Sequence, residues 1–410
     1  MDRRVFLRNG TLALVSLGFA PAFIAETAAA SQRRRILVAI FQRGAVDGLN
    51  MVVPFGDRAY YQGRPSIAIA RPGASGGAVD LDGFFGLHPR MAPLAPWFSS
   101  GQLAIVHASG SHDDTRSHFD AQDYMESGTP GMKSTRDGWM NRYLHAREHH
   151  SASPFRAVAI AQQLPRSLQG SAPALAIGNL GRFGVRDDMT GGMTAASGFE
   201  AQYAEAADAL LAPVGRDAFD AVKRMQQIDP AGYAPASGAE YPRSGFGDAM
   251  KQIAQIIKGD LGLEVAFTEL GQWDHHANEG GATGQLANRL DDFTRGIAAF
   301  ARDLGDRMAD VVVVTMSEFG RTVRENGNRG TDHGHGNAML VLGGDVRGGK
   351  VYGRWPGLER EQLWQGRDLA ITTDFRDVFT ELVTDHLGAT DVSRIFPGHR
   401  AGERLGLLRT

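Results

Sequence analysis

Cysteine is absent from the 410-residue chain, which excludes disulfides, thiolate metal sites, iron–sulfur clusters and a cysteine nucleophile. An excess of positive charge is also missing, because 43 Lys and Arg stand against 46 Asp and Glu, for a formal net charge of −3. This balance disfavours nucleic-acid binding. The composition, with 42% hydrophobic and 22% charged residues, is that of a globular protein. Any bound metal must therefore have imidazole and oxygen ligands.

The N-terminal apolar stretch, residues 11–25, is too short for a membrane span, which needs about 20 residues. It follows Arg3 and Arg4 and precedes three alanines at 28–30, a small-residue site of the kind at which signal peptides are cleaved. The paired arginines resemble the twin-arginine export signal. We therefore predict that residues 1–30 are a signal peptide and that the twin-arginine translocase is a transient partner. The mature protein is predicted to be periplasmic or secreted, without a stable transmembrane segment.

Short apolar runs alternate with helical patterns through residues 31–410. Seven runs predict buried strands, several of them nearly continuous Val, Ile, Leu and Ala: 35–41, 103–107, 155–161, 174–177, 264–270, 310–316 and 338–342. Apolar residues at steps of three and four predict helices over 217–228, 248–257 and 284–304. The alternation predicts a single α/β domain with a mostly parallel sheet sandwiched by helices. Two Gly- or Pro-rich excursions are expected, near 181–198 and 229–247.

In an open α/β sheet, ligands bind beyond the carboxyl ends of the strands, and polar clusters follow four of the predicted strands. Asp47 follows the first, between two glycines, and is either a cation ligand or part of an Asp-Gly turn. Ser117 lies in the second cluster, where a helix is predicted to begin. Its hydroxyl is either a helix cap or a nucleophile aided by the helix dipole. Ser111 and Thr115 remain alternative nucleophiles.

The other two clusters combine acidic and imidazole groups. Asp274 and His276 occupy alternate positions, so an extended segment would direct both toward one metal, unless this is merely a polar loop end. Glu318 and Arg321 follow a later strand, and then come His333 and His335 with glycines beside them. We expect the glycines to let both imidazoles approach one point, although a plain Gly-rich loop is the alternative. The clusters together predict a centre for one or two divalent ions.

Five motifs in this order resemble the bacterial family of domain of unknown function 1501, whose members are often exported by the twin-arginine route. They are residues 43–50, 117–122, 273–276, 317–322 and 331–336. The resemblance covers nearly the whole mature chain, but that family has no settled activity. More remotely, the order of the motifs is similar to that of the alkaline phosphatase and sulfatase superfamily. This implies an alkaline-phosphatase-like fold and an exported metal-dependent hydrolase of phosphate or sulfate esters, small or polymeric.

The resemblance also implies roles for individual residues. The implied ligands of a divalent ion (Zn, Mn, Fe or Ca) are Asp47, Asp274, His276, Glu318, and His333 or His335. The implied catalytic groups are Ser117 as nucleophile, Arg321 as the charge-neutralising group, and His118 or His112 as acid or base. One departure is Phe319, which stands where that superfamily has an imidazole. It favours the alternative of a non-catalytic periplasmic binding or assembly protein of the same fold with a structural metal. An oxidoreductase is disfavoured, because no G-x-G-x-x-G follows the first strand.

Overall fold

The computed structural model describes residues 5–6, 13–15, 35–147, 153–182 and 232–409. The paired arginines and the cleavage site of the predicted signal peptide lie outside the described residues. So do the helix predicted over 217–228 and most of the excursion predicted near 181–198. The excursion near 229–247 is described from residue 232, and its residues 232–244 form no helix or strand.

The fold is built on an eleven-stranded sheet that contains all seven predicted strands. Its spatial order is β1 (Val5–Phe6), β2 (Ala13–Val15), β9 (Ala174–Ala176), β8 (Ala157–Ala159), β10 (Val265–Leu270), β3 (Ile36–Gln42), β11 (Val311–Met316), β12 (Asn337–Gly343), β7 (Leu103–Gly110) and β13 (Val351–Tyr352), with β14 (Thr373–Asp374) also paired to β7. The run from β9 to β11 is parallel, whereas β12 is antiparallel to both neighbours. A small second sheet contains β4 (Val52–Val53), β6 (Gly86–Leu87) and β5 (Val79–Asp80).

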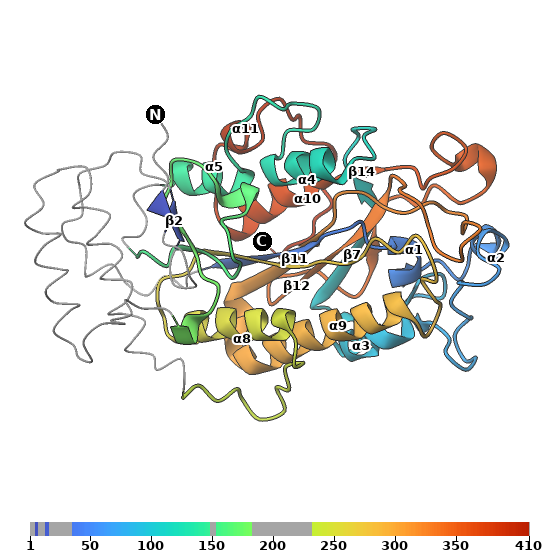
Figure 1. Cartoon of the computed structure of the whole chain (residues 1–410), viewed down its shortest axis with the longest axis horizontal. Coiled ribbons are helices and arrows are strands. Elements are labelled where there is room, and N and C mark those ends of the chain that lie inside the picture. Colours follow the sequence, from blue (N-terminus) through green and yellow to red (C-terminus); the bar gives the residue numbers. More distant parts are fainter. Residues whose placement is uncertain (1–4, 7–12, 16–34, 148–152, 183–231, 410) are drawn as a thin grey trace, which may run out of the picture.

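Helices cover both faces of the large sheet (Figure 1). One face carries α4 (His118–Ser127), α5 (Trp139–Ala146), α10 (Phe375–Glu381) and α11 (Val392–Ile395), and the other carries α3 (Ala95–Ser99), α8 (Gly245–Lys258) and α9 (Gln285–Leu304). Shorter elements are α1 (Gly48–Met51), α2 (Arg58–Gly63), η1 (Pro89–Leu94), η2 (Arg166–Leu168), η3 (Leu180–Arg182), η4 (Gly305–Asp310), η5 (Arg360–Gln362) and η6 (Leu382–His386). The predicted α/β class, a mostly parallel sheet sandwiched by helices, is confirmed.

Strand β3 shows why the central strands are almost wholly apolar. Its successive side chains alternate between the two faces of the sheet. Ile36, Val38 and Ile40 belong to the core that includes α8 and α9. The alternate positions belong to the core that includes α5 and α10; these are Leu37, Ala39 and Phe41. Both faces are buried, so no position favours a polar residue. No helix in the described part of the chain is long and apolar enough to cross a membrane.

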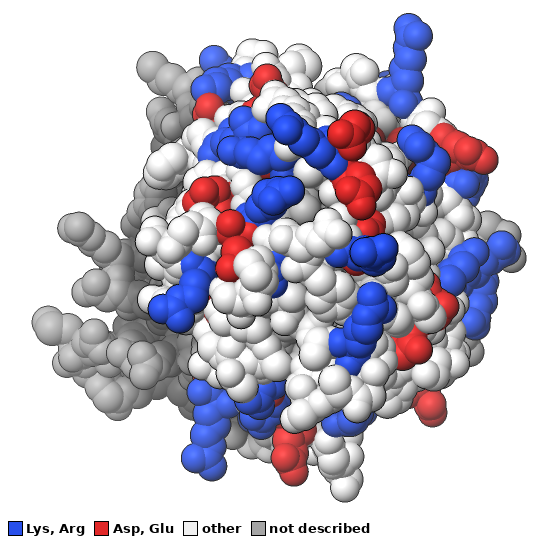
Figure 2. All heavy atoms as spheres, turned by 90° about the vertical axis from the view of Figure 1, so that its right-hand side faces the viewer, with Lys and Arg blue, Asp and Glu red and all other residues white. Residues whose placement is uncertain are grey.

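The parallel register brings the polar segments to one edge of the sheet. Leu270 pairs with Gln42, and Met316 pairs with Phe41, so β10, β3 and β11 end at nearly the same level. Asn337, at the start of β12, pairs with Ser109 near the end of β7. The segments that leave or enter these strands therefore share the edge from which α1 and α2 emerge. Figure 2 shows the molecule from this side, with acidic and basic side chains interspersed.

Candidate metal centre

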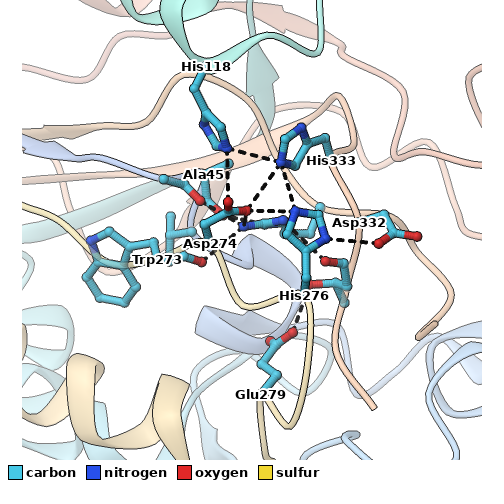
Figure 3. A network of polar contacts seen from close by, with 12 residues as sticks. Ala45, His118, Trp273, Asp274, His276, Glu279, Asp332 and His333 are labelled. Carbon is cyan, nitrogen blue, oxygen red and sulfur yellow. Dashed lines mark hydrogen bonds and ion pairs between the residues drawn. The ribbon is translucent and has the colours of Figure 1, made fainter. Parts of the chain in front are cut away.

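Three imidazoles and one carboxylate converge at this edge (Figure 3). His118 is the first residue of α4, His276 follows β10, and His333 precedes β12. The Nε2 atom of His333 lies 3.0 Å from Nε2 of His118 and 3.0 Å from Nε2 of His276. Asp274 Oδ1 lies 3.2 Å from Nε2 of His333 and 3.0 Å from Nε2 of His276, while its Oδ2 lies 3.5 Å from Nε2 of His118. These four side chains are the His3Asp cluster.

An acceptor holds the Nδ1 atom of each imidazole in the cluster. His118 Nδ1 lies 2.8 Å from a carboxylate oxygen of Glu318, and His276 Nδ1 lies 3.0 Å from one of Asp332. His333 Nδ1 lies 2.8 Å from the main-chain oxygen of Arg116. Because these oxygens can only accept, each neutral imidazole carries its proton on Nδ1. The Nε2 lone pairs of His118 and His276 are thereby each brought against Nε2 of His333.

Lone pairs this close repel unless a cation lies between them, so the donor set fits a bound metal ion. Three imidazole nitrogens and a carboxylate suit Zn²⁺, Mn²⁺ or Fe, and they are unlike the oxygen sets that hold Ca²⁺. Among the described residues, the group with this capability is His118, Asp274 and His333. His276 extends it, through its contacts with Asp274 and His333. The predicted ligands Asp274, His276 and His333 are thus brought together.

Glu318, also predicted as a ligand, lies behind His118. Its buried carboxylate accepts hydrogen bonds from the Gly44 amide and the Gln122 side chain, both at 2.8 Å, as well as from His118. Burial alone would raise the pKa of Glu318, but these hydrogen bonds lower it below the usual value. The hydrogen bond to Glu318 in turn raises the pKa of His118. The arrangement is the carboxylate–histidine pair that orients many metal ligands.

Arg321 holds Asp274 in place. Its side chain has no exposed surface. Nε donates to the Ala45 oxygen at 2.7 Å, Nη1 donates to the Thr331 oxygen at 3.2 Å, and Nη2 pairs with Asp274. Burial opposes ionisation of Asp274, but Arg321 outweighs it and lowers the pKa of that carboxyl. The resemblance inferred from the sequence implied that Arg321 neutralises the charge of the transferred group. Its placement instead makes it a positioning residue.

Three other predicted residues lie outside the His3Asp cluster. Asp47 is buried and paired with Arg64. His335 stacks on Trp364 with ring centroids 4.2 Å apart, and burial lowers its pKa to about 4. His112 is exposed on the loop before α4. The glycine spacers therefore do not bring two imidazoles to one point.

The glycines of this edge allow loops to meet backbone to backbone. A Cβ on Gly320 would lie 1.8 Å from the Gly336 oxygen. One on Gly44, whose φ is +114°, would lie 2.9 Å from the Trp273 nitrogen. A side chain at either position would force the loops apart. The close approach of the loops at this edge therefore depends on glycine at these two positions.

Sequence reasoning missed the polar side chains that support Glu318. Gln122 lies four residues after His118 on α4, so both side chains share one helix face. Arg43 donates to Gln122 at 3.1 Å and to Glu126 at 2.8 Å, and it also pairs with Glu269. The four-residue spacing from His118 could have predicted that Gln122 lies on the same helix face and near the same site. The partners of Arg43 had no such signal, because they lie on α4 and β10, far from Arg43 along the chain.

We expect Glu318→Gln to weaken binding of a divalent ion about 10- to 100-fold, the usual cost of losing a ligand-orienting carboxylate. The amide keeps the shape but loses the charge that holds His118 Nδ1. Competition with a chromophoric chelator measures the affinity. Glu269→Gln is the matched control, because Glu269 pairs with Arg43, which donates to the Gln122 that supports Glu318, but is 42% exposed and has no hydrogen bond to an imidazole in the described part of the chain. Equal weakening by both variants would show that the effect is not specific to His118.

Residues 34–396 match the protein family described as "protein of unknown function (DUF1501)". The match spans most of the sequence, and the chain belongs to this family. The resemblance inferred from the five motifs is confirmed. No curated protein matches the sequence significantly.

Several solved structures align with this chain. The zinc complex of the C-terminal periplasmic domain of EcEptC from Escherichia coli aligns at 10% identity and a TM-score of 0.34, over 76% of this chain and 73% of that one. A phosphonate monoester hydrolase of Agrobacterium radiobacter aligns at 10% identity and a TM-score of 0.31, over 90% of this chain and 78% of that one. The PsFucS1 sulfatase from Pseudoalteromonas sp. aligns at 12% identity and a TM-score of 0.37, over 88% of this chain and 69% of that one. TM-scores below 0.5 carry none of these activities over to this chain.

Proposed function

We propose that this protein is an exported metal-dependent hydrolase of phosphate or sulfate esters. The observation that carries the proposal is the convergence of three imidazole Nε2 atoms and the Asp274 carboxylate, one of the imidazoles being that of His118, the residue after Ser117. A divalent ion held by His118, Asp274, His276 and His333 supplies Lewis acidity to such a site. Glu318, Asp332 and the Arg116 carbonyl orient the three imidazoles.

Ser117 is the best-placed nucleophile of the three considered. It is the N-cap residue of α4, is exposed, and makes no side-chain capping bond. The other two hydroxyls serve local turns. Thr115 Oγ1 accepts from the Ser117 amide at 3.2 Å, and Ser111 Oγ accepts from the Asp113 amide at 3.2 Å. Ser117 also directly precedes His118, a member of the His3Asp cluster.

The beginning of α4 favours an anionic ester. The first N–H groups of a helix lack intrahelical acceptors and, with the helix dipole, they bind phosphate or sulfate oxygens. Attack by Ser117 Oγ forms a bond to phosphorus or sulfur and breaks the bond to the leaving alcohol, which takes up a proton. Water then hydrolyses the seryl ester. Of the two histidines considered as acid or base, His118 belongs to the cluster. His112, on the same loop as Ser117, is therefore the candidate for proton transfer.

Export by the twin-arginine route remains part of the proposal and rests on the sequence of residues 1–30. A non-catalytic role is the second candidate, favoured by Phe319. Its ring packs against the rings of His118 and His333, with centroids 5.0 Å away in both cases. An apolar wall beside two ligands suits a structural ion in a periplasmic binding or assembly protein.

The test combines metal analysis with hydrolysis of nitrophenyl phosphate and nitrophenyl sulfate by protein purified from producing cells. We expect bound metal, hydrolysis that stops on chelation and returns with a divalent ion, and neither property in Asp274→Asn. Metal-free protein with equal residual rates in both forms would end the proposal. Bound metal whose removal lowers Tm, without turnover of any ester, would support the structural alternative.

A further inference from the structure

A buried arginine, Arg64, donates hydrogen bonds to both carboxylate oxygens of Asp47. The side chains of Arg64 and Asp47 are 0% and 2% exposed, and both carboxylate oxygens of Asp47 accept from the guanidinium, Oδ1 at 2.9 Å. The remaining donors of Arg64 reach Asn50 Oδ1 at 2.8 Å and the main-chain oxygens of Thr322 and Val323, each at 3.0 Å. Every N–H donor of the guanidinium therefore has an acceptor.

A second buried carboxyl group completes this arrangement. Glu279 lies against Asp47 and accepts from the Thr331 hydroxyl at 2.7 Å, while its Oε1 finds no donor among the described residues. Burial, and then the charge of Asp47, raise the pKa of Glu279 well above its usual value. Burial opposes ionisation of Asp47 as well, but Arg64 lowers the pKa of that carboxyl. Asp47 is therefore the acid whose negative charge Arg64 favours, and Glu279 is the acid whose ionisation burial and Asp47 oppose.

We propose that Arg64 acts as a built-in cation at Asp47, so that the chain binds one divalent ion at the His3Asp cluster and none at Asp47. The inference rests on the metal centre of the proposed function. A bidentate guanidinium stays charged at any physiological pH, and displacing it would leave a buried arginine without its partner. Both oxygens of Asp47 are therefore engaged by the guanidinium, although the motif order implies that Asp47 is a metal ligand.

Counting bound ions tests the proposal. Calorimetric titration of chelator-treated protein with Mn²⁺ or Zn²⁺ is expected to give one ion per chain in the wild type, one in Asp47→Asn and none in His333→Asn. Asparagine keeps both an acceptor for Arg64 and the helix-capping oxygen that Asp47 offers to the Leu49 amide. Two ions in the wild type, with one lost in Asp47→Asn, would overturn the inference and leave the proposed function intact.

A second measurement is independent of any metal. Arg64→Ala opens a hole the size of a guanidinium beside Asp47 and Asn50. Low millimolar guanidinium chloride is expected to raise the Tm of this variant relative to sodium chloride, but not that of the wild type. Absence of that specific rise would contradict the built-in cation even if the protein binds no metal. If Arg64→Ala does not fold, the ion count of Asp47→Asn decides alone.

Discussion

Ser117→Ala is expected to abolish ester hydrolysis while leaving the divalent ion bound. Removing an attacking hydroxyl from an enzyme that forms a covalent intermediate lowers kcat by a factor on the order of 10⁴ or more. The Ser117 hydroxyl makes no capping bond, so its loss should leave α4 and His118 in place. The measurement is kcat on nitrophenyl phosphate or sulfate, with metal content determined on the same samples.

Ser111→Ala is the matched control, because it removes another hydroxyl of the same loop. We expect Ser111→Ala to retain most of the activity. A Ser117→Ala variant that keeps the wild-type rate, with metal bound, would exclude the serine as nucleophile and point to direct attack by water. A rapid burst of nitrophenol in the wild type, absent from Ser117→Ala, would independently support the seryl intermediate.

Changing Asp47 and Glu279 together to their amides is expected to destabilise the protein by about 3–5 kcal/mol, the usual effect of leaving one buried charge without a partner. Each single change should cost much less. In Asp47→Asn, Glu279 can lose its proton and balance Arg64. In Glu279→Gln, a neutral acid is replaced by a neutral amide. The double variant leaves Arg64 buried with no carboxylate.

Urea unfolding of the wild type, both single variants and the double variant measures this coupling as a double-mutant cycle. The expected result is a double effect far larger than the sum of the single effects. Additive losses would show that the two carboxyl groups do not share one charge. Glu325→Gln is a suitable control, since Glu325 accepts hydrogen bonds from Ser66 but is not part of the buried acid pair.

The strands and their shared edge could be predicted because the physics that fixes them is local. A run such as residues 311–316, buried on both faces, is apolar except for Thr315. Parallel strands then place their carboxyl ends together, which brings Asp274 and the loop containing His333 to one place. The helix after Ser117 could also be predicted, because serine is common at the position immediately before a helix begins.

The direction of individual side chains could not be predicted. His333 and His335 are two positions apart, yet His333 joins the His3Asp cluster whereas His335 stacks on Trp364. Glu318 looks like a ligand in sequence, yet its Oε1 atom accepts from the amide of Gly44 and from the ring of His118. Nothing in the sequence links Asp47 to Arg64, because their contact depends on how α1 and α2 pack.

The ligand nitrogens come from positions 118, 276 and 333, carried by segments that adjoin β7, β10 and β12. An unfolded chain holds them too far apart to bind one ion tightly. The ion consequently adds to the stability of the native state alone, in proportion to the logarithm of its free concentration. For a chain exported after folding, the compartment in which the sheet first assembles would then determine which metal the protein carries.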